Sequence, residues 1–193
     1  DAAKRLEFVG YEHFSAEAKV VGVLVEGKSE KSASVGNEVE VVLDRTPFYA
    51  EGGGQLADGG LITTGDGTVI EIDDVQSPIP GLFVHRGRVR DGEIIHGASA
   101  LAEIDHERRV GISRAHTATH MVHKAFREIL GETATQAGSE NAPGRFRFDF
   151  PSAGAVPTSV LDEVEMRVNV LLAQDLEVSA AEMSIADAKA IGA

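Results

Sequence analysis

The sequence predicts an α+β protein, in which a small antiparallel β-barrel precedes an α/β unit with a histidine-bearing helix packed on a sheet. Up to about Asp105, short apolar alternations are separated by Gly, Asp and Pro, which is typical of a small barrel or curled sheet. Beyond Asp105 the apolar period becomes helical. We therefore expect a barrel over residues 1–104 and a second unit over residues 105–193, each with its own core.

Two strands and two turns stand out in the first unit. Residues 19–26 and 38–44 have the composition of strands, and the second places three apolar side chains on one face: Val39, Val41 and Leu43. Gly65-Asp66-Gly67 separates two apolar pairs and predicts a hairpin turn. Asp91-Gly92 predicts another hairpin turn.

The second unit opens with a long helix. Asp105 is a suitable N-cap, and the helical pattern continues to Leu130, with a possible break over residues 111–113. Gly131 then occupies the place of an αL cap. We expect this helix to carry the chemistry described below.

Further elements follow the long helix. Residues 145–150 alternate and predict a core strand with Phe146, Phe148 and Phe150 on one side. Thr158 or Ser159 is positioned to cap a helix whose apolar stripe is Leu161, Val164, Val168, Leu171 and Leu172. Residues 184–191 predict a short helix closed by Gly192.

Composition restricts the function classes. The net charge of −13 opposes non-specific attraction to a polyanion. The sequence has no cysteine, so only His, Asp and Glu are available as side-chain metal ligands. No apolar run is long enough to span a bilayer and the N-terminus does not resemble a signal peptide, so we expect a cytoplasmic protein without a membrane partner. The sequence does not indicate an oligomeric state.

Three histidines cluster on the long helix. His116 and His120 are four residues apart, a spacing that lets two imidazoles chelate one metal ion. At about 100° per residue, His123 falls in the same sector, opposite the apolar face. The alternative is that these side chains are only solvated or hydrogen-bonded. Thr117 stands where H-E-x-x-H metalloproteases have Glu, and a tetrahedral zinc needs two further ligands.

A glycine-rich loop runs from Asp44 to Gln55. Its consecutive glycines free the backbone to approach a ligand closely, and Gln55 offers both a donor and an acceptor. The alternative is a flexible hairpin loop with Phe48 and Tyr49 packed in the core. The lysine and the glycine spacing of a phosphate-binding loop are missing.

Arginines raise a separate question about phosphate binding. Arg86, Arg88 and Arg90 alternate along a predicted strand, where their guanidinium groups could meet phosphates. The alternative is a solvated edge strand that charge protects from aggregation. The same question applies to three arginines of the long helix: Arg108, Arg109 and Arg114.

Together, Asp44 to Gln55 and His116 to His120 resemble two signatures of the alanyl-tRNA synthetase family, in the same order. The family's loop reads D-R-T-P-F-Y-A-E-S-G-G-Q, and here Gly52 replaces the usual Ser. Further matching segments are Phe8-Val9-Gly10-Tyr11, Arg108-Arg109, Gln136-Ala137-Gly138-Ser139, Arg147-Phe148-Asp149-Phe150 and Ala188-Lys189-Ala190-Ile191-Gly192-Ala193. The resemblance covers essentially the whole chain and is highly specific.

The resemblance implies a barrel followed by the first part of the family's editing domain. The parent attaches alanine to tRNA(Ala) with ATP and magnesium in a region outside this chain, and its editing site hydrolyses tRNA mischarged with serine or glycine. His116 and His120 look like the first two zinc ligands, which a later C-x-x-x-H completes in the family. That motif is absent here, so we expect the isolated chain to be inactive.

The resemblance also implies roles for particular residues. Thr119, Gln136 and Gln55 are expected around the mischarged amino acid as catalytic residues, although Thr119 could instead bond back to its own helix. Five residues are expected to contact substrate or tRNA: Arg45, Gly52, Gly53, Gly54 and Arg147. tRNA(Ala) is the expected partner, mainly through the parent protein. The alternatives are a free-standing trans-editing deacylase, which would carry its own C-x-x-x-H, and a non-catalytic RNA-binding module.

Overall fold

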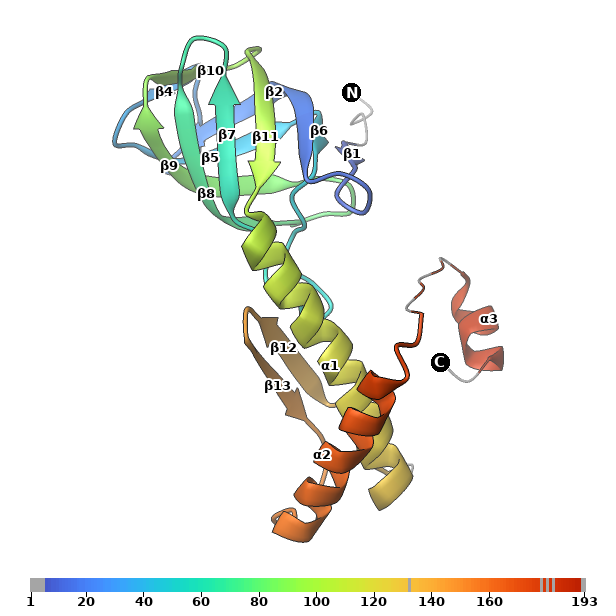
Figure 1. The fold of residues 1–193 in the computed structure, drawn as a ribbon. Coiled ribbons are helices and arrows are strands. Elements are labelled where there is room, and N and C mark those ends of the chain that lie inside the picture. Colours follow the sequence, from blue (N-terminus) through green and yellow to red (C-terminus); the bar gives the residue numbers. More distant parts are fainter. Residues whose placement is uncertain (1–5, 132, 178, 180, 182, 192–193) are drawn as a thin grey trace.

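A computed structural model describes residues 6–131, 133–177, 179, 181 and 183–191. Figure 1 shows a β-barrel at one end of a long helix, with a β-hairpin and a second helix packed along the rest of that helix. The mixed α+β class predicted from the sequence is confirmed. In the described part of the chain, no helix is long and apolar enough to cross a membrane.

The barrel is built from strands whose side chains alternate between its interior and solvent. Six strands close it in the order β11 (Ser99–Ile104), β7 (Gly60–Thr64), β8 (Val69–Gln76), β9 (Val84–Asp91), β5 (Glu38–Leu43) and β2 (Ser15–Val25), and β11 pairs back onto β2. Val39, Val41 and Leu43 lie in the core, as predicted. The two predicted strands correspond to β2 and β5, and the predicted turn over residues 65–67 joins β7 to β8.

Short strands extend the barrel. β3 (Lys28–Ser29) pairs with β2, β4 (Ser32–Ser34) pairs with β10 (Glu93–Ile95), and β1 (Glu7–Phe8) runs parallel to β6 (Arg45–Thr46). The predicted hairpin at Asp91-Gly92 is wrong, because β9 pairs with β5 and β8 whereas β10 pairs with β4. The chain passes from β9 to β10 at Gly92, which has φ +70° and where a Cβ would lie 2.5 Å from Oγ1 of Thr68.

Helix α1 (His106–Leu130) leaves the barrel directly after β11. The Asp105 side chain accepts from the backbone N–H of Arg108 at 2.9 Å, which confirms the predicted N-cap. The helix continues without the break considered at residues 111–113. Gly131 ends it, but φ 90° and ψ 178° lie outside the αL region, so the predicted αL cap is wrong.

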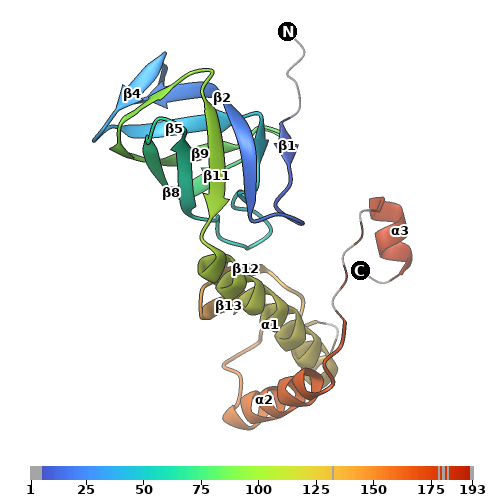
Figure 2. The same cartoon turned by 45° about the horizontal axis from the view of Figure 1, so that its top comes forward.

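A second core forms between α1, the hairpin β12 (Gly138–Ala142) and β13 (Arg145–Asp149), and α2 (Thr158–Ala173). Figures 1 and 2 show these elements lying together. Phe148 and Phe150 pack against Phe126 of α1. Phe146 is 36% exposed and, although it alternates with Phe148 and Phe150, it does not join this second core. The prediction of a core strand is therefore wrong at this residue.

Helices α2 and α3 (Ile185–Ala190) differ from prediction in detail. Pro157 occupies the N-cap position of α2, so neither Thr158 nor Ser159 caps it. Only Val164 of the predicted stripe is fully buried, while Leu161 and Leu172 are exposed because only one side of α2 meets α1. The short helix predicted over residues 184–191 is present as α3, and Ser184 caps it. The predicted closing residue, Gly192, lies outside the described residues.

Candidate functional site

The consecutive glycines form a tight turn. Gly52 and Gln55 exchange backbone hydrogen bonds of 3.1 and 2.9 Å, and Gly53 and Gly54 between them have φ +59° and +79°. Two positive φ angles at the central positions characterise a type I′ turn, which glycine adopts without strain. A Cβ at Gly54 would also lie 2.2 Å from Oγ of Ser139. The turn therefore requires Gly53 and Gly54, whereas Gly52 has ordinary φ and open space.

Gln55 joins this glycine turn to the histidines of α1. Its Oε1 lies 3.1 Å from Nδ1 of His116, and the side chain is nearly buried. The imidazoles of His116 and His120 stack with centroids 5.0 Å apart. Burial, and then the neighbouring His120, lower the pKa of His116, which favours the neutral ring. Two motifs separated in sequence thus meet in one place.

The third histidine points elsewhere. The His123 ring lies 5.2 Å from that of Phe148, where α1 meets the hairpin. Its Nε2 is buried and has no hydrogen-bond partner in the described part of the chain. The expected common face of three histidines is therefore reduced to the pair His116 and His120.

Thr119 lies on the hairpin side of α1 and is 3% exposed. Its hydroxyl group lies 3.0 Å from the carbonyl oxygen of Ala115 and 2.6 Å from Oδ1 of Asn141. Asn141 is fully buried, and its backbone accepts from Leu56 N and donates to Gly54 O. The back-bond to the helix considered for Thr119 is present, together with a link through Asn141 to the glycine turn.

Gln136 reaches the turn from another side. Its Nε2 donates to Oγ of Ser139 at 3.0 Å, and Ser139 packs against Gly54. A neighbouring pocket of about 500 Å³ is lined by residues that include Gly52, Gly54 and Arg147. The exposed Arg147 pairs with Asp149 at 3.1 Å. Thus most of the predicted site residues lie around the glycine turn.

The remaining predicted arginine sites lie apart from this cluster. Arg45 pairs with Glu7 at 2.7 Å on the side of the barrel, in a different hollow. The three arginines of β9 are each paired with carboxylates: Arg86 with Glu40 and Asp74, Arg88 with Glu38, and Arg90 with Glu71. These pairings favour a solvated charged face over a phosphate-binding row. The edge strand considered from the sequence is wrong, because β9 pairs with both β5 and β8.

The imidazole pair fits part of a zinc site. Oε1 of Gln55 faces Nδ1 of His116, and a proton on Nδ1 leaves Nε2 of that ring with the lone pair that a metal needs. The stacked ring of His120 is the second donor. Within the described ranges, no cluster of three or more His, Cys, Asp or Glu side chains is suited to hold a metal ion. The donors present match half of a tetrahedral zinc site.

Residues 1–108 match the family model described as tRNA synthetases class II (A). The chain is 64% identical over 188 residues to the alanine–tRNA ligase of Acidothermus cellulolyticus and 55% identical over 193 residues to that of Streptomyces avermitilis. The chain belongs to the alanyl-tRNA synthetase family. These alignments cover 97% and 100% of the chain but only 21% and 22% of the two ligases.

The chain therefore spans about a fifth of the length of these curated ligases. A third relative, from Nocardioides sp., is 59% identical over 188 residues, which are 97% of the chain and 21% of that ligase. Gly52, where the alanyl-tRNA synthetase signature has Ser, has space for a Cβ, which would lie 3.8 Å from Ala50 O. The turn can therefore accommodate the family's Ser at this position.

Sequence reasoning missed Asn141, Asp58 and the role of Arg109. Asp58 is 0% exposed, and Arg109 pairs with it rather than facing solvent. Asn141 had no recognisable signal, because a single Asn in a turn-rich stretch is common. The buried partners of Arg109 lie 51 and more residues away in sequence, so no local pattern could reveal them.

Proposed function

We propose that this chain forms part of the proofreading site of an alanine–tRNA ligase, where tRNA(Ala) mischarged with serine or glycine is hydrolysed. The observation that carries the proposal is the 3.1 Å contact between Gln55 and His116. It joins the glycine turn of the barrel to the imidazole pair of α1. ATP- and magnesium-dependent attachment of alanine belongs to other parts of the ligase, which acts in the cytosol.

The substrate in this proposal is the ester between an amino acid and the terminal ribose of tRNA. Gln55 fixes the His116 ring, and the turn presents backbone groups beside the pocket that Arg147 lines. Zinc held by His116 and His120 would polarise the ester or lower the pKa of a water molecule. Two further ligands would have to come from outside the described residues, so we propose that the isolated chain is inactive.

Discrimination between serine and alanine calls for a group that recognises a hydroxyl. A site built to hydrogen-bond a hydroxyl rejects a ligand that lacks one, because its polar groups are then left unpaired. We assign this role to Thr119, whose Oγ1 retains one acceptor position beyond its contacts with Ala115 and Asn141, with Gln136 on the other side of the turn. Removing the Thr119 hydroxyl should change the ratio of seryl to alanyl ester hydrolysis by about 1 to 3 kcal/mol in the transition state.

The two alternatives have less support. A free-standing deacylase of the same superfamily would carry its own C-x-x-x-H, and this sequence has no cysteine. A non-catalytic RNA-binding module would use exposed cations, but the arginines of β9 are paired with carboxylates and the net charge is −13. A non-catalytic module would also give no reason for Gln55 to contact His116.

For the test, this chain replaces the matching segment within the full-length Acidothermus cellulolyticus ligase, which gives a chimaera. In that chimaera, the double change His116→Ala and His120→Ala should reduce zinc content and Ser-tRNA(Ala) hydrolysis. Alanine activation should be unaffected, which serves as the internal control for folding. Hydrolysis at the unaltered rate by the double variant would refute the assignment of the histidines.

A further inference from the structure

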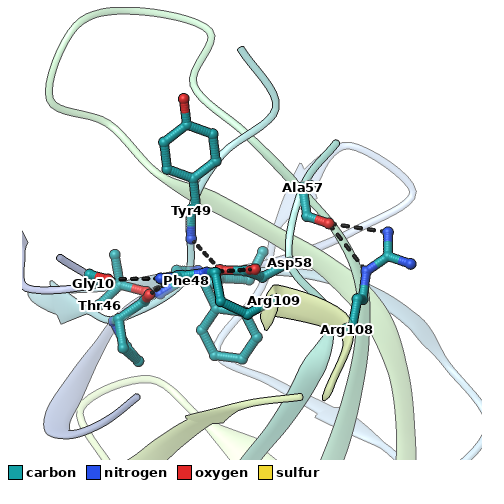
Figure 3. A network of polar contacts seen from close by, with 10 residues as sticks. Gly10, Thr46, Phe48, Tyr49, Ala57, Asp58, Arg108 and Arg109 are labelled. Atoms are coloured by element: carbon teal, nitrogen blue, oxygen red, sulfur yellow. Dashed lines mark hydrogen bonds and ion pairs between the residues drawn. The ribbon is translucent and has the colours of Figure 1, made fainter. Parts of the chain in front are cut away.

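Arg109 and Asp58 form a buried ion pair where α1 leaves the barrel, as Figure 3 shows. The Nε of Arg109 donates to Oδ1 and Oδ2 of Asp58 at 2.9 and 3.1 Å, and its Nη2 donates to Oδ2 as well. The side chains are 11% and 0% exposed. Both charges are therefore removed from water, and each depends on the other.

The same guanidinium group also binds the backbone of two other segments. Its Nη1 donates to Gly10 O at 2.7 Å, and its Nη2 donates to Pro47 O at 3.0 Å. Gly10 packs so closely that a Cβ there would lie 2.2 Å from Pro47 O. Arg109 thus uses the planar, forked geometry that distinguishes arginine from lysine.

Asp58 closes the loop that carries the glycine turn. Its Oδ2 accepts from Tyr49 N at 2.8 Å, and its own N–H donates to Tyr49 O at 3.1 Å. Arg108 donates to the carbonyl oxygen of Ala57 from Nε and Nη2, at 3.2 and 3.0 Å. Figure 3 shows both arginines reaching this neck of the loop. Gln55 lies only three residues before Asp58.

Helix α1 carries both Arg109, which holds the loop, and His116, which contacts Gln55. His116 follows Arg109 by seven residues, which is about 10.5 Å along a helix and close to two full turns. Because a helix is stiff over two turns, the point where Arg109 holds the loop fixes where the loop can meet His116. Asn141 holds the opposite side of the turn through Gly54 and Leu56.

We infer that Asp58 and Arg109 are a positioning pair, which sets the place of Gln55 against His116 and so determines which nitrogen of that ring carries the proton. The positioning itself does not depend on the proposed function. Only the role of the positioned His116 ring in hydrolysis rests on it. If the pair merely attached the barrel to α1, weakening it would leave the contact between Gln55 and His116 intact in any folded variant.

The test is ¹⁵N NMR of the His116 ring in the 193-residue chain, because ring ¹⁵N shifts distinguish the two neutral tautomers. Arg109→Lys keeps the charge but cannot engage Asp58, Gly10 and Pro47 together. We expect loss of the Nδ1–H tautomer preference, as in the positive control Gln55→Ala. Arg167→Lys is the matched control, since Arg167 also ties α1 to another element through Glu128 at 2.7 Å but does not touch the loop.

A folded Arg109→Lys chain with the unaltered His116 spectrum would overturn the inference. If that variant does not fold, Asp58→Asn decides in the same way, because it keeps the shape of Asp58 but removes the charge that pairs with Arg109. The same variants in the chimaera separate the two proposals. Tautomer loss with unchanged Ser-tRNA(Ala) hydrolysis would leave the positioning pair standing and refute the proofreading role of this site.

Discussion

The hydroxyl group of Thr119 lies 2.6 Å from Oδ1 of Asn141 and 3.0 Å from the Ala115 carbonyl oxygen. One hydroxyl proton cannot serve two acceptors. Rotating the side-chain amide of Asn141 by 180° resolves this. Its Nδ2 would then donate to Thr119 Oγ1, while the Thr119 hydroxyl donates to the Ala115 carbonyl oxygen. In the orientation shown, Nδ2 of Asn141 is buried without a partner in the described part of the chain.

Thr119→Val should therefore destabilise the chain by about 1 to 3 kcal/mol, because it leaves a buried amide without its partner. Urea unfolding measures the change. The double variant Thr119→Val with Asn141→Leu replaces both polar groups and should recover part of the loss. An unaltered midpoint for Thr119→Val would show that the contact contributes nothing to stability.

The glycine turn permits a comparison of three adjacent positions. Gly53→Ser should cost about 1 to 2 kcal/mol because of its positive φ, and Gly54→Ser more, because its Cβ would also collide with Ser139. Gly52→Ser, which restores the family signature, is the matched control and should be nearly neutral. Thermal unfolding ranks the three, and a large cost at Gly52 would contradict the turn geometry.

Stability should depend on pH through His85, which is fully buried between Thr46 and Val41. Burial lowers its pKa from 6.5 to about 4 in the folded chain. As the pH falls below 6.5, the unfolded chain takes up a proton that the folded chain does not, so stability decreases until about pH 4. The full loss is about 3 kcal/mol, at 1.36 kcal/mol per pKa unit.

Urea unfolding at pH 7.5 and 4.5 tests this. Carboxylates with lowered pKa values, such as Asp66, also contribute to acid sensitivity, so the informative quantity is the difference between the wild-type chain and His85→Gln. The variant should be less stable at pH 7.5 but should lose less on acidification. Equal losses in both chains would show that His85 is not the responsible group.

The isolated chain should bind zinc at least about 100-fold more weakly than the chimaera, because two imidazoles supply half of a tetrahedral site. It should also fail to hydrolyse Ser-tRNA(Ala). Chelator competition measures the affinity, and radiolabelled seryl ester measures hydrolysis. Full zinc occupancy with rapid hydrolysis by the chain alone would show that the site is complete without further ligands.

Local signals in the sequence were sufficient for the barrel strands and for α1. The alternation of Val39, Val41 and Leu43 predicts a buried face, and Asp105 predicts the start of a helix. Both features depend only on neighbours within a few residues. His116 and His120 could be paired for the same reason. The position of Gln55 beside them followed from family resemblance rather than from a pattern.

Contacts between distant segments were not predictable in this way. Gly92 was expected to close a hairpin, but the partner strand β4 decides where the chain goes after it. Likewise, Leu161 and Leu172 fit an apolar helical stripe, although α1 covers only part of α2. The ion pair of Asp58 and Arg109 joins residues 51 positions apart, beyond the reach of any periodicity.

Strand β11 continues through Asp105 directly into α1, so a change of angle at Asp105 moves the whole helix relative to the barrel. With a rise of 1.5 Å per residue, a tilt of about 10° at Asp105 would displace His116 by about 3 Å and Leu130 by about 6 Å. Small angular errors at the barrel rim are thus magnified at the imidazoles. Substitutions at that rim, far from any substrate, would change the spacing between the barrel and the imidazole pair.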